Sequence, residues 1–515
     1  MKPVIVSLIG DPIDNLYQLG LRERDSFLKI EKRVTKLLST NFLLRFGQDV
    51  ITLARTILIR REESFFDKCI KSYSEGLGID ASRYMSFLSL FDLAAQYGQA
   101  YPELKGILPG CSSIFSKTEE GHVHTRLLDF PLIGLFEEAP RVYFWQPQGL
   151  APIISFSSEG LAPLFFQGIH GNGISFALHH KPGNSMHRDG QSIFQIAFET
   201  LFKAEHLSDF KREMKKKTSV TKWAFLLLEK SGQALEMDID GPTQKIETYN
   251  INDTSPLIFT NIPLQNDSSA FESYIKFSEI RQSWLKEKLR GQDKQNILDL
   301  VTDVEDQKIK SWLHPGSTLS TVGAYSVNLT NGFIDIKVGQ SALVKSDAIY
   351  RISLSNHLDI NALKEKSSSS EFEKAWKLMA RAQSSFDQGA YETAYHELQI
   401  AISTMPHPVW REILSFYLCI WDFKFVENNK ELALIYKKIK MINAPPPLKD
   451  QWMLFIMRFE KRLDLLPTVN AKDISPHLQP LFQQEKLAAR PLFATWMKLL
   501  YPRLEILDIF SPHQK

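Results

Sequence analysis

The sequence has few cysteines, no long apolar run and no large excess of charge of either sign. Its three cysteines, Cys69, Cys111 and Cys419, are too few for a disulfide framework and favour a reducing compartment. No window approaches the roughly 18 apolar residues that a membrane-spanning helix needs. The first residues have neither the apolar run nor the small-residue cleavage site of a signal peptide. We therefore expect a cytoplasmic protein, with export by a route that leaves no N-terminal mark still open.

The charge pattern also argues against a nucleic-acid partner. The net charge is only +2, and the basic residues are spread along the chain instead of forming the cluster that phosphate binding needs. The one dense basic run, residues 211–217, is expected to be the solvated face of a helix. Apolar residues make up 43% and charged residues 23% of the chain, which is typical of a globular protein. A length of 515 residues predicts two or three domains.

Changes in sequence texture divide the chain into four segments. Residues 1–110 begin with a strand pattern and continue with long amphipathic helical patterns, so we expect a helix-rich pro-segment. Residues 111–360 contain short runs typical of strands, interrupted by two helical stretches, and are expected to form the catalytic core. The strand-like runs are residues 122–130, 141–145, 152–158, 174–180, 256–262, 318–329 and 332–339, and the helical stretches are 192–217 and 271–289.

The remaining two segments are a linker and a helical domain. Residues 361–371 are polar and rich in serine, which is typical of a linker. Residues 372–515 have helical patterns almost throughout. Within them, residues 375–406 resemble one tetratricopeptide (TPR) repeat, with small, turn and terminator residues at the usual places, and a looser helical pair spans 409–441. A TPR-like domain, which would bind a protein partner, and a generic helical domain both remain open.

Cys111 lies where the helix-rich segment meets the strand-rich one. A thiol at such a junction can attack the carbonyl of the preceding Gly110, giving a thioester that hydrolysis resolves. Cys111 would then have a free α-amine, whose reference pKa of about 7.7–8.0 lets it act as a general base near neutral pH. One residue would thus supply both nucleophile and base. The alternative is that Cys111 is a structural cysteine.

Arg126 and Asp129 follow Cys111 after 15 and 18 residues. In a hairpin of that length, the second strand returns beside Cys111. Arg126 would then favour the thiolate, and Asp129 would accept a hydrogen bond from the α-ammonium. The residues alone also allow a buried ion pair between Arg126 and Asp129 that has a structural role only.

The segment around Cys111 resembles the start of the mature chain in a known family. This is the 6-aminopenicillanic-acid (isopenicillin-N) acyltransferase family of N-terminal-nucleophile (Ntn) hydrolases, related to the bile-salt hydrolase, acid ceramidase and N-acylethanolamine amidase branches. The matching residues are Gly110, Cys111, Ser112, Ser113, Gly121, Arg126, Asp129 and Phe130. Weaker similarities continue in order over roughly residues 5–355. Leu127 departs from the pattern, because the family has a polar residue there.

The resemblance implies an α+β fold with a four-layer αββα core, followed here by an all-α domain outside the shared fold. It implies self-cleavage between Gly110 and Cys111, with Cys111 as nucleophile and base, and Asp129 and Arg126 as supporting groups. It also implies that Asn261 donates its side-chain N–H to the developing oxyanion, a contact typically worth about 3–4 kcal/mol. Without the resemblance, Asn261 would be read as a turn residue before Pro263.

Other residues are weaker candidates for substrate binding. They are His179, Arg281, Phe130 and Trp145. Arg281 on a helix is more commonly an exposed residue, and the aromatic side chains are more commonly core. His122 and His124 alternate on one strand, but no third ligand is evident, so we expect neither a metal nor another cofactor.

Two functions from different classes follow. The first is a cysteine amidohydrolase or acyltransferase that cleaves itself and acts on linear N-acyl amides through a thioester. The second is an interaction protein, in which an Ntn-fold scaffold without activity carries the helical domain. The sequence identifies neither the acyl group nor the acceptor.

Overall fold

The structure is a computed structural model of the chain. It describes residues 2–38, 64–100, 110–129, 139–183, 186–187, 189–251, 255–265, 272–290, 297–298, 321–338, 348–353, 360–364, 371–406, 408–426, 428–443, 446–474 and 479–487. By its internal contacts the chain divides into two units, of which the first comprises residues 1–32, 45–303 and 320–367 and the second residues 33–44, 304–319 and 368–515. None of the described helices is both long enough and apolar enough to cross a membrane.

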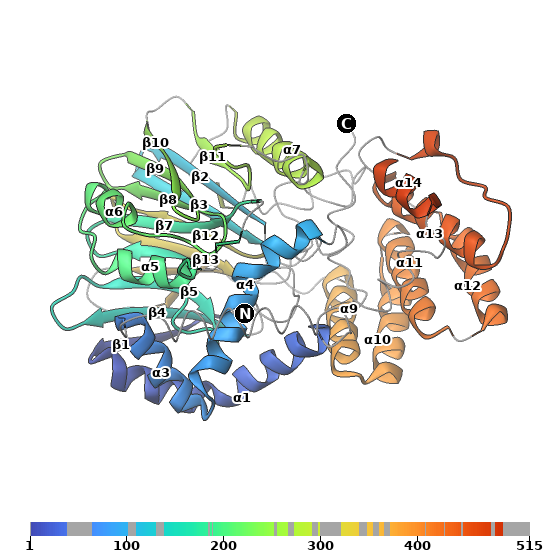
Figure 1. Cartoon of the computed structure of the whole chain (residues 1–515), viewed down its shortest axis with the longest axis horizontal. Helices are drawn as coiled ribbons and strands as arrows, with labels where there is room; N and C mark the ends of the chain where they lie inside the picture. Colours follow the sequence, from blue (N-terminus) through green and yellow to red (C-terminus); the bar gives the residue numbers. More distant parts are fainter. Residues whose placement is uncertain are drawn as a thin grey trace. The chain divides into compact units, whose positions relative to one another are not determined.

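The first unit contains two β-sheets (Figure 1). The first sheet has the strand order β1-β4-β5-β6-β7-β8-β9-β10 and the second has the order β11-β2-β3-β12-β13-β14-β15. The first-sheet strands are β1 (Val4–Gly10), β4 (Pro140–Pro147), β5 (Ile153–Ser158), β6 (Gln167–His170), β7 (Ile174–His180), β8 (Trp223–Glu229), β9 (Gln233–Asp240) and β10 (Thr243–Asn250). The second-sheet strands are β11 (Leu257–Phe259), β2 (Cys111–Thr118), β3 (Gly121–Asp129), β12 (Thr321–Asn328), β13 (Phe333–Val338), β14 (Ile349–Ser353) and β15 (Ile360–Lys364).

The strand patterns in the sequence correspond well to these sheets. Each strand-like run named above contains a strand, and the mixed α/β character is confirmed. Strand β10 was not predicted from the sequence, because its residues are mostly exposed and polar on both faces and form no apolar run. The expected linker also begins too early, because residues 361–364 belong to β15 and pair with β14.

The N-terminal segment is part of the first sheet. Strand β1 is its edge strand and pairs with β4 in parallel, whereas every other strand pair between the described strands is antiparallel. The strand expected at the start of residues 1–110 is therefore confirmed, and its place at the edge of the first sheet is what the sequence did not predict.

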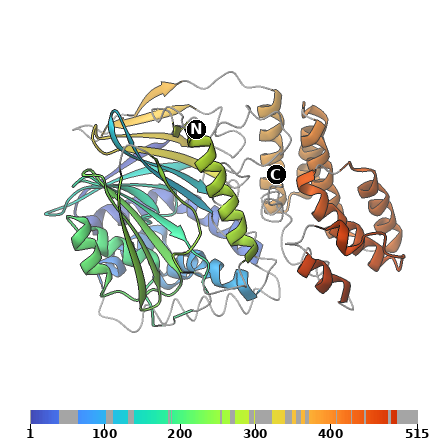
Figure 2. The ribbon, with the colours of Figure 1, turned by 90° about the horizontal axis from the view of Figure 1, so that it is seen from above.

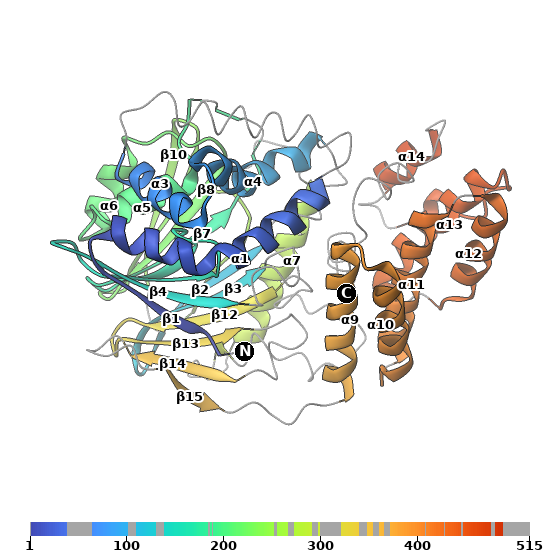
Figure 3. The ribbon, with the colours of Figure 1, turned by 90° about the horizontal axis from the view of Figure 1, so that it is seen from below.

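The helices of the first unit cover the outer faces of the two sheets (Figures 2 and 3). They are α1 (Pro12–Leu38), α3 (Phe65–Leu77), α4 (Ala81–Ala100), α5 (Ile193–Leu201), α6 (Leu207–Met214) and α7 (Glu272–Leu289). On the first sheet, the Trp145 ring of β4 packs against Phe198 of α5, and Tyr143 donates its hydroxyl to Glu23 of α1. The basic run at residues 211–217 lies at the end of α6, as expected, and forms local ion pairs such as Lys216–Glu213.

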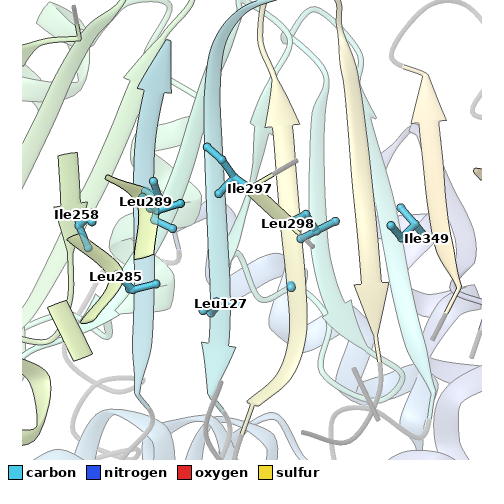
Figure 4. Packing of buried hydrophobic residues seen from close by; sticks show 9 residues of the cluster. Leu127, Ile258, Leu285, Leu289, Ile297, Leu298 and Ile349 are labelled. Carbon is cyan, nitrogen blue, oxygen red and sulfur yellow. The ribbon is translucent and has the colours of Figure 1, made fainter. Parts of the chain in front are cut away.

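Helix α7 covers the outer face of the second sheet. Its Leu285 and Leu289 pack on Ile114 of β2 and Leu127 of β3 (Figure 4). The inner faces of the two sheets meet, as the contact between Phe156 of β5 and Tyr325 of β12 shows. The order of layers is therefore helix, sheet, sheet and helix, with the side chains of alternate residues between the sheets.

The described part of the second unit is all helical from Glu371 onward. Its elements are α9 (Glu371–Gln388), α10 (Tyr391–Thr404), α11 (Pro408–Phe425), α12 (Asn429–Met441), α13 (Pro446–Arg462), a short 3-10 helix η5 (Ala471–Asp473) and α14 (Gln479–Leu487). Gly389, with a φ of 84°, ends α9, and the buried Ala382, Ala394 and Ala401 let α9 and α10 pack closely. The expected all-α character fits the residues that the structure describes from Glu371 to Leu487, and the TPR assignment stays a prediction.

Candidate active site

Cys111 is the first residue of strand β2 and directly follows Gly110. Its side chain points between the sheets and is only 3% exposed. The β2–β3 hairpin turns at Gly121, whose φ is +118° and whose Cβ, if present, would lie 1.9 Å from Thr330 Oγ1. This hairpin returns β3 beside Cys111, with Cys111 opposite Leu128 and Ser113 opposite Arg126. The return of β3 beside the cysteine was predicted from the sequence spacing.

Arg126 donates a hydrogen bond from Nη2 to the Cys111 sulfur at 3.0 Å. The guanidinium is buried and is otherwise held by carbonyls: Nη1 donates to Phe166 O at 2.5 Å and Nη2 to Leu178 O at 2.6 Å. Among the described residues, no carboxylate forms an ion pair with Arg126. Its positive charge is therefore available to stabilise a thiolate.

Asn261 holds the backbone nitrogen of Cys111. The Cys111 N–H donates to Asn261 Oδ1 at 3.0 Å, and Asn261 Nδ2 donates to the carbonyl of His180 at 2.8 Å. The family resemblance implies that the side-chain N–H of Asn261 donates to an oxyanion. In the structure, the side-chain oxygen faces the Cys111 nitrogen, and one N–H of Asn261 is used by β7.

Arg281 joins the groups around Cys111. Its Nη1 donates to Asp129 Oδ2 at 2.6 Å, and its Nη2 donates to the Cys111 carbonyl at 3.1 Å and also to Asn261 Oδ1. The commoner expectation for a helix arginine, an exposed side chain, is wrong here, because Arg281 is 1% exposed. The helix pattern could not show this, since α7 has polar residues on several sides.

Asp129 contacts the Gly110 side of the Gly110–Cys111 bond, whereas Asn261 contacts the Cys111 nitrogen. Its backbone N–H donates to the Gly110 carbonyl at 2.9 Å, and its carboxylate accepts from Arg281 and, through Oδ1, from Thr321 at 2.6 Å. A Cβ at Gly110 would lie 2.7 Å from Asp129 Oδ2 and 2.8 Å from Arg281 Nη1. Only glycine fits at this position without moving the ion pair. Thr321 was not singled out in the sequence, where nothing separates it from other strand threonines.

A chain of buried hydrogen bonds leads away from the cysteine between the sheets. His179 Nε2 bonds Ser113 Oγ at 2.9 Å, His124 Nε2 bonds the same oxygen at 3.1 Å, and His124 Nδ1 bonds Ser175 Oγ at 3.0 Å. Burial lowers the pKa of His124 to about 3, with the Arg126 charge adding to the effect, and burial likewise holds the pKa of His179 well below its usual range.

The direction of the protons in this chain follows from its far end. Ser175 donates its only hydroxyl proton to the Leu228 carbonyl, so its oxygen accepts from His124 Nδ1. Neutral His124 then accepts from Ser113 at Nε2, and Ser113 accepts from His179 Nε2. Within the described residues, His179 Nδ1 is left as a buried lone pair with no hydrogen-bond partner. His179 is therefore held next to the site as a neutral acceptor.

The remaining predicted residues lie apart from this cluster. Trp145 is fully buried on the outer face of the first sheet, where it packs on Phe165 and Phe198, so the structure assigns it to the core. Phe130 lies outside the described residues. His122 bonds the Lys230 carbonyl instead of forming a pair with His124. Within the described ranges, no group of three or more His, Cys, Asp and Glu side chains is placed to hold a metal ion.

Comparison with known proteins gives distant structural matches only. No family model matches the sequence, and no curated protein matches it. A mutant of conjugated bile acid hydrolase from Clostridium perfringens matches with 11% identity and a TM-score of 0.32, over 50% of this chain and 97% of the other. An N-acylethanolamine-hydrolyzing acid amidase orthologue from Caenorhabditis elegans matches with 13% identity and a TM-score of 0.30, over 43% and 93%. Penicillin V acylase from Agrobacterium tumefaciens matches with 11% identity and a TM-score of 0.30, over 50% and 98%. At these values the likeness carries no inference about activity.

Proposed function

We propose that this protein is a cysteine amidohydrolase of the Ntn type, which cleaves itself before Cys111 and then acts on N-acyl amides. The observation that carries the proposal is that the sulfur and the backbone nitrogen of Cys111 are each held by a different buried group. Arg126 donates to the sulfur, and Asn261 accepts from the nitrogen. A structural cysteine requires neither contact. The resemblance of residues 110–130 to the start of a mature Ntn chain supports the same conclusion.

Self-cleavage begins with attack of the Cys111 sulfur on the Gly110 carbonyl carbon. A C–S bond forms, the Gly110–Cys111 C–N bond breaks, and the thiol proton passes to the departing nitrogen. The Asp129 N–H already donates to the Gly110 oxygen, so it stabilises the negative charge that develops there. Water then hydrolyses the thioester and leaves residues 1–110 with a C-terminal carboxylate.

The cleaved protein would have a free α-amine at Cys111 beside Asn261 Oδ1. This amine takes the thiol proton while the sulfur attacks the carbonyl carbon of a substrate amide, and it returns the proton to the leaving amine. Arg281 holds the Cys111 carbonyl and the Asn261 oxygen, which fixes the direction of the amine. Water, or a second amine, then accepts the acyl group from the thioester. Hydrolysis and transfer differ only in this acceptor.

The acyl group of the substrate stays open. Trp145, one of the aromatic residues that the sequence suggested for substrate binding, packs on Phe165 in the core. This packing gives no support for a particular fatty or aryl group. The amide class therefore rests on the family resemblance of the segment around Cys111.

Intact mass spectrometry of the purified protein tests the proposal. We expect two fragments, residues 1–110 and 111–515, in the wild type and only the full chain in Cys111→Ala. Cys69→Ala and Cys419→Ala are matched controls, because they remove other buried thiols and should leave cleavage unchanged. A screen of N-acyl amides against the cleaved protein then tests the second step. A wild-type chain that stays whole and inert to these amides would instead support the scaffold without activity.

A further inference from the structure

The loop of residues 260–265, which contains Asn261, is bonded to charged side chains on the first sheet. Strand β9 has the carboxylates of Glu236, Asp238 and Asp240 at alternate positions, hence on one face. Asp238 Oδ2 accepts a hydrogen bond from the backbone N–H of Leu264 at 2.7 Å. The loop from residue 260 to 265 thus runs along this acidic face.

Lys181 lies between the acidic row and Asn261. Its Nζ donates to Glu236 Oε1 at 3.0 Å, to the Thr260 carbonyl at 3.1 Å and to the Ile262 carbonyl. The side chain of Lys181 is 1% exposed and that of Glu236 is 7% exposed, so this is a buried ion pair. All three ammonium protons are used, and two of them go to the carbonyls on either side of Asn261.

Lys181 and His180, whose carbonyl accepts a hydrogen bond from the Asn261 side chain, are neighbours in the sequence. His180, whose carbonyl accepts from Asn261 Nδ2, directly precedes Lys181 at the end of β7. The loop is therefore held from β7 both at the side chain of Asn261 and at the backbone on either side of it. Without the ammonium, two buried carbonyls and the Glu236 carboxylate would lose a partner, which is costly.

A buried ion pair contributes little to stability compared with apolar side chains of the same volume. Its position indicates another role. Arg281 already draws the Asn261 oxygen toward α7, whereas Lys181 holds the backbone on either side of the same residue toward β7. Arg281 and Lys181 together fix the position of the Asn261 side-chain oxygen next to the Cys111 nitrogen.

We propose that Lys181 is a positioning residue, which fixes the Asn261 amide against the Cys111 nitrogen by holding the carbonyls of Thr260 and Ile262, with Glu236 as its counter-ion. The role of Asn261 in the reaction rests on the function proposed above. The arrangement of the loop does not rest on it.

The test compares Lys181→Met with Lys222→Met. Lys222 is a matched control, because its Nζ holds the other end of the same loop, at the Gln265 carbonyl, at 3.1 Å, and lies 3.9 Å from Asp240. Self-cleavage is followed over time after cell-free synthesis of the full chain. We expect cleavage to slow by about tenfold or more in Lys181→Met, the range for loss of a charge-assisted hydrogen bond, and by less than about twofold in Lys222→Met.

Hydrogen exchange of the 260–262 backbone gives a second readout that needs no activity. Exchange there should rise in Lys181→Met and not in Lys222→Met. Equal cleavage rates and equal exchange in the two variants would overturn the positioning role while leaving the proposed function intact. If the wild type does not cleave itself, the proposed function fails, and the exchange comparison alone still decides whether Lys181 orders the loop.

The double variant Lys181→Met/Glu236→Gln separates positioning from the cost of an unpaired charge. It removes both charges, so we expect its melting temperature to recover relative to Lys181→Met. Its cleavage rate should stay low, because no cation holds the loop carbonyls. Recovery of cleavage together with stability would show that Lys181 only neutralises Glu236, and the positioning role would be abandoned.

Discussion

Cys111 and Cys419 are similarly buried thiols in the two units, and their surroundings differ in charge. Cys419 lies on α11 in the helical unit, where burial, together with the negative charge of Asp422, raises the pKa of its thiol to about 12. Burial also raises the pKa of Cys69, with Asp11 adding to the effect. Cys111 instead receives a hydrogen bond from a buried guanidinium. Burial and a nearby carboxylate thus raise the pKa of the other two thiols, whereas Cys111 lies beside an arginine with which no carboxylate forms an ion pair in the described part of the chain.

The two arginines beside Cys111 repeat this difference on a smaller scale. Arg281 forms an ion pair with Asp129, so the carboxylate largely neutralises its charge. Arg126 is held by the carbonyls of Phe166 and Leu178, which fix its position without cancelling its charge. We therefore propose that Arg126 activates the sulfur and that Arg281 aligns the Cys111 backbone.

The largest expected effect comes from removing the positive charge of Arg126, which Cys111 has beside it and Cys419 does not. In Arg126→Leu, Cys111 loses its charge-assisted hydrogen bond, typically worth about 1.5–3 kcal/mol, so its alkylation at neutral pH should slow by roughly tenfold to a hundredfold. Iodoacetamide labelling with peptide mapping follows Cys111, Cys69 and Cys419 in one sample. Arg351→Leu is the control, since Arg351 pairs with Asp335 on the same sheet. Unchanged labelling of Cys111 in Arg126→Leu would show that Arg126 does not set the reactivity of this thiol.

A second variant acts on the bond to be cleaved and leaves the sulfur intact. In Gly110→Ala the new methyl group would collide with Asp129 Oδ2 and Arg281 Nη1, and the ion pair must move. We expect self-cleavage to slow by about tenfold or more, because displacement of reacting groups by about 1 Å is costly. Ser112→Ala, on the other side of Cys111, removes a buried hydroxyl that has no partner among the described residues, so it should cleave at the wild-type rate. Equal rates in the two variants would show that the fit at Gly110 is irrelevant to cleavage.

A smaller effect is expected from the hydroxyl behind Asp129. Thr321→Val keeps the shape of the side chain and removes the hydrogen bond to Asp129 Oδ1, so the carboxylate is held by Arg281 with one contact fewer. We expect cleavage to slow by roughly threefold to tenfold, corresponding to about 1 kcal/mol. Thr125→Val is the control, because the Thr125 hydroxyl bonds that of Ser326 on the neighbouring strand. Gel-based time courses of both variants measure the difference, and a Thr125→Val chain as slow as Thr321→Val would contradict the role given to Thr321.

The sequence predicts the fold best where patterns are local. The strand runs from residue 122 to 339 and the helix over 271–289 all correspond to elements, because alternation and helical periodicity survive in the sequence. Strand β10 could not be found in this way, since it buries little on either face. The parallel pairing of β1 with β4 was equally hidden, because it joins segments about 137 residues apart and leaves no local pattern.

The site shows the same limit. The side-chain contact of Arg126 with Cys111 follows from the length of one hairpin, and the sequence predicted it. The contacts of Arg281, Thr321 and Lys181 with this region join residues between 79 and 192 positions apart, so no spacing rule predicts them. The family resemblance pointed to Asn261, but the side of its amide that faces Cys111 depends on His180, which only the structure shows.

The last prediction concerns the stability of the fold below neutral pH, which the buried histidines near Cys111 should control. Burial lowers the pKa of His124 to about 3, so between that value and its unfolded pKa near 6.5 the unfolded chain binds a proton that the folded chain does not. The stability that His124 contributes is therefore complete above pH 6.5 and is lost as the pH falls, by about 1.4 kcal/mol per pH unit. In His124→Asn this loss disappears, so the difference in melting temperature from the wild type should shrink between pH 7 and pH 4.5.

Asp92 provides a control of the opposite sign. Burial raises its pKa from 3.8 to about 6, despite hydrogen bonds from Ser192 and from the backbone of Ile193, so its contribution is present below pH 3.8 and is lost as the pH rises through 6. Asp92→Asn should therefore approach the wild type as the pH rises, whereas His124→Asn should approach it as the pH falls. Scanning calorimetry of both variants at several pH values measures the two slopes. If the slopes of the two variants have the same sign, groups other than His124 and Asp92 control how stability depends on pH. Burial would then not set the charge states of His124 and Asp92, in contrast to its effect on the thiol of Cys419.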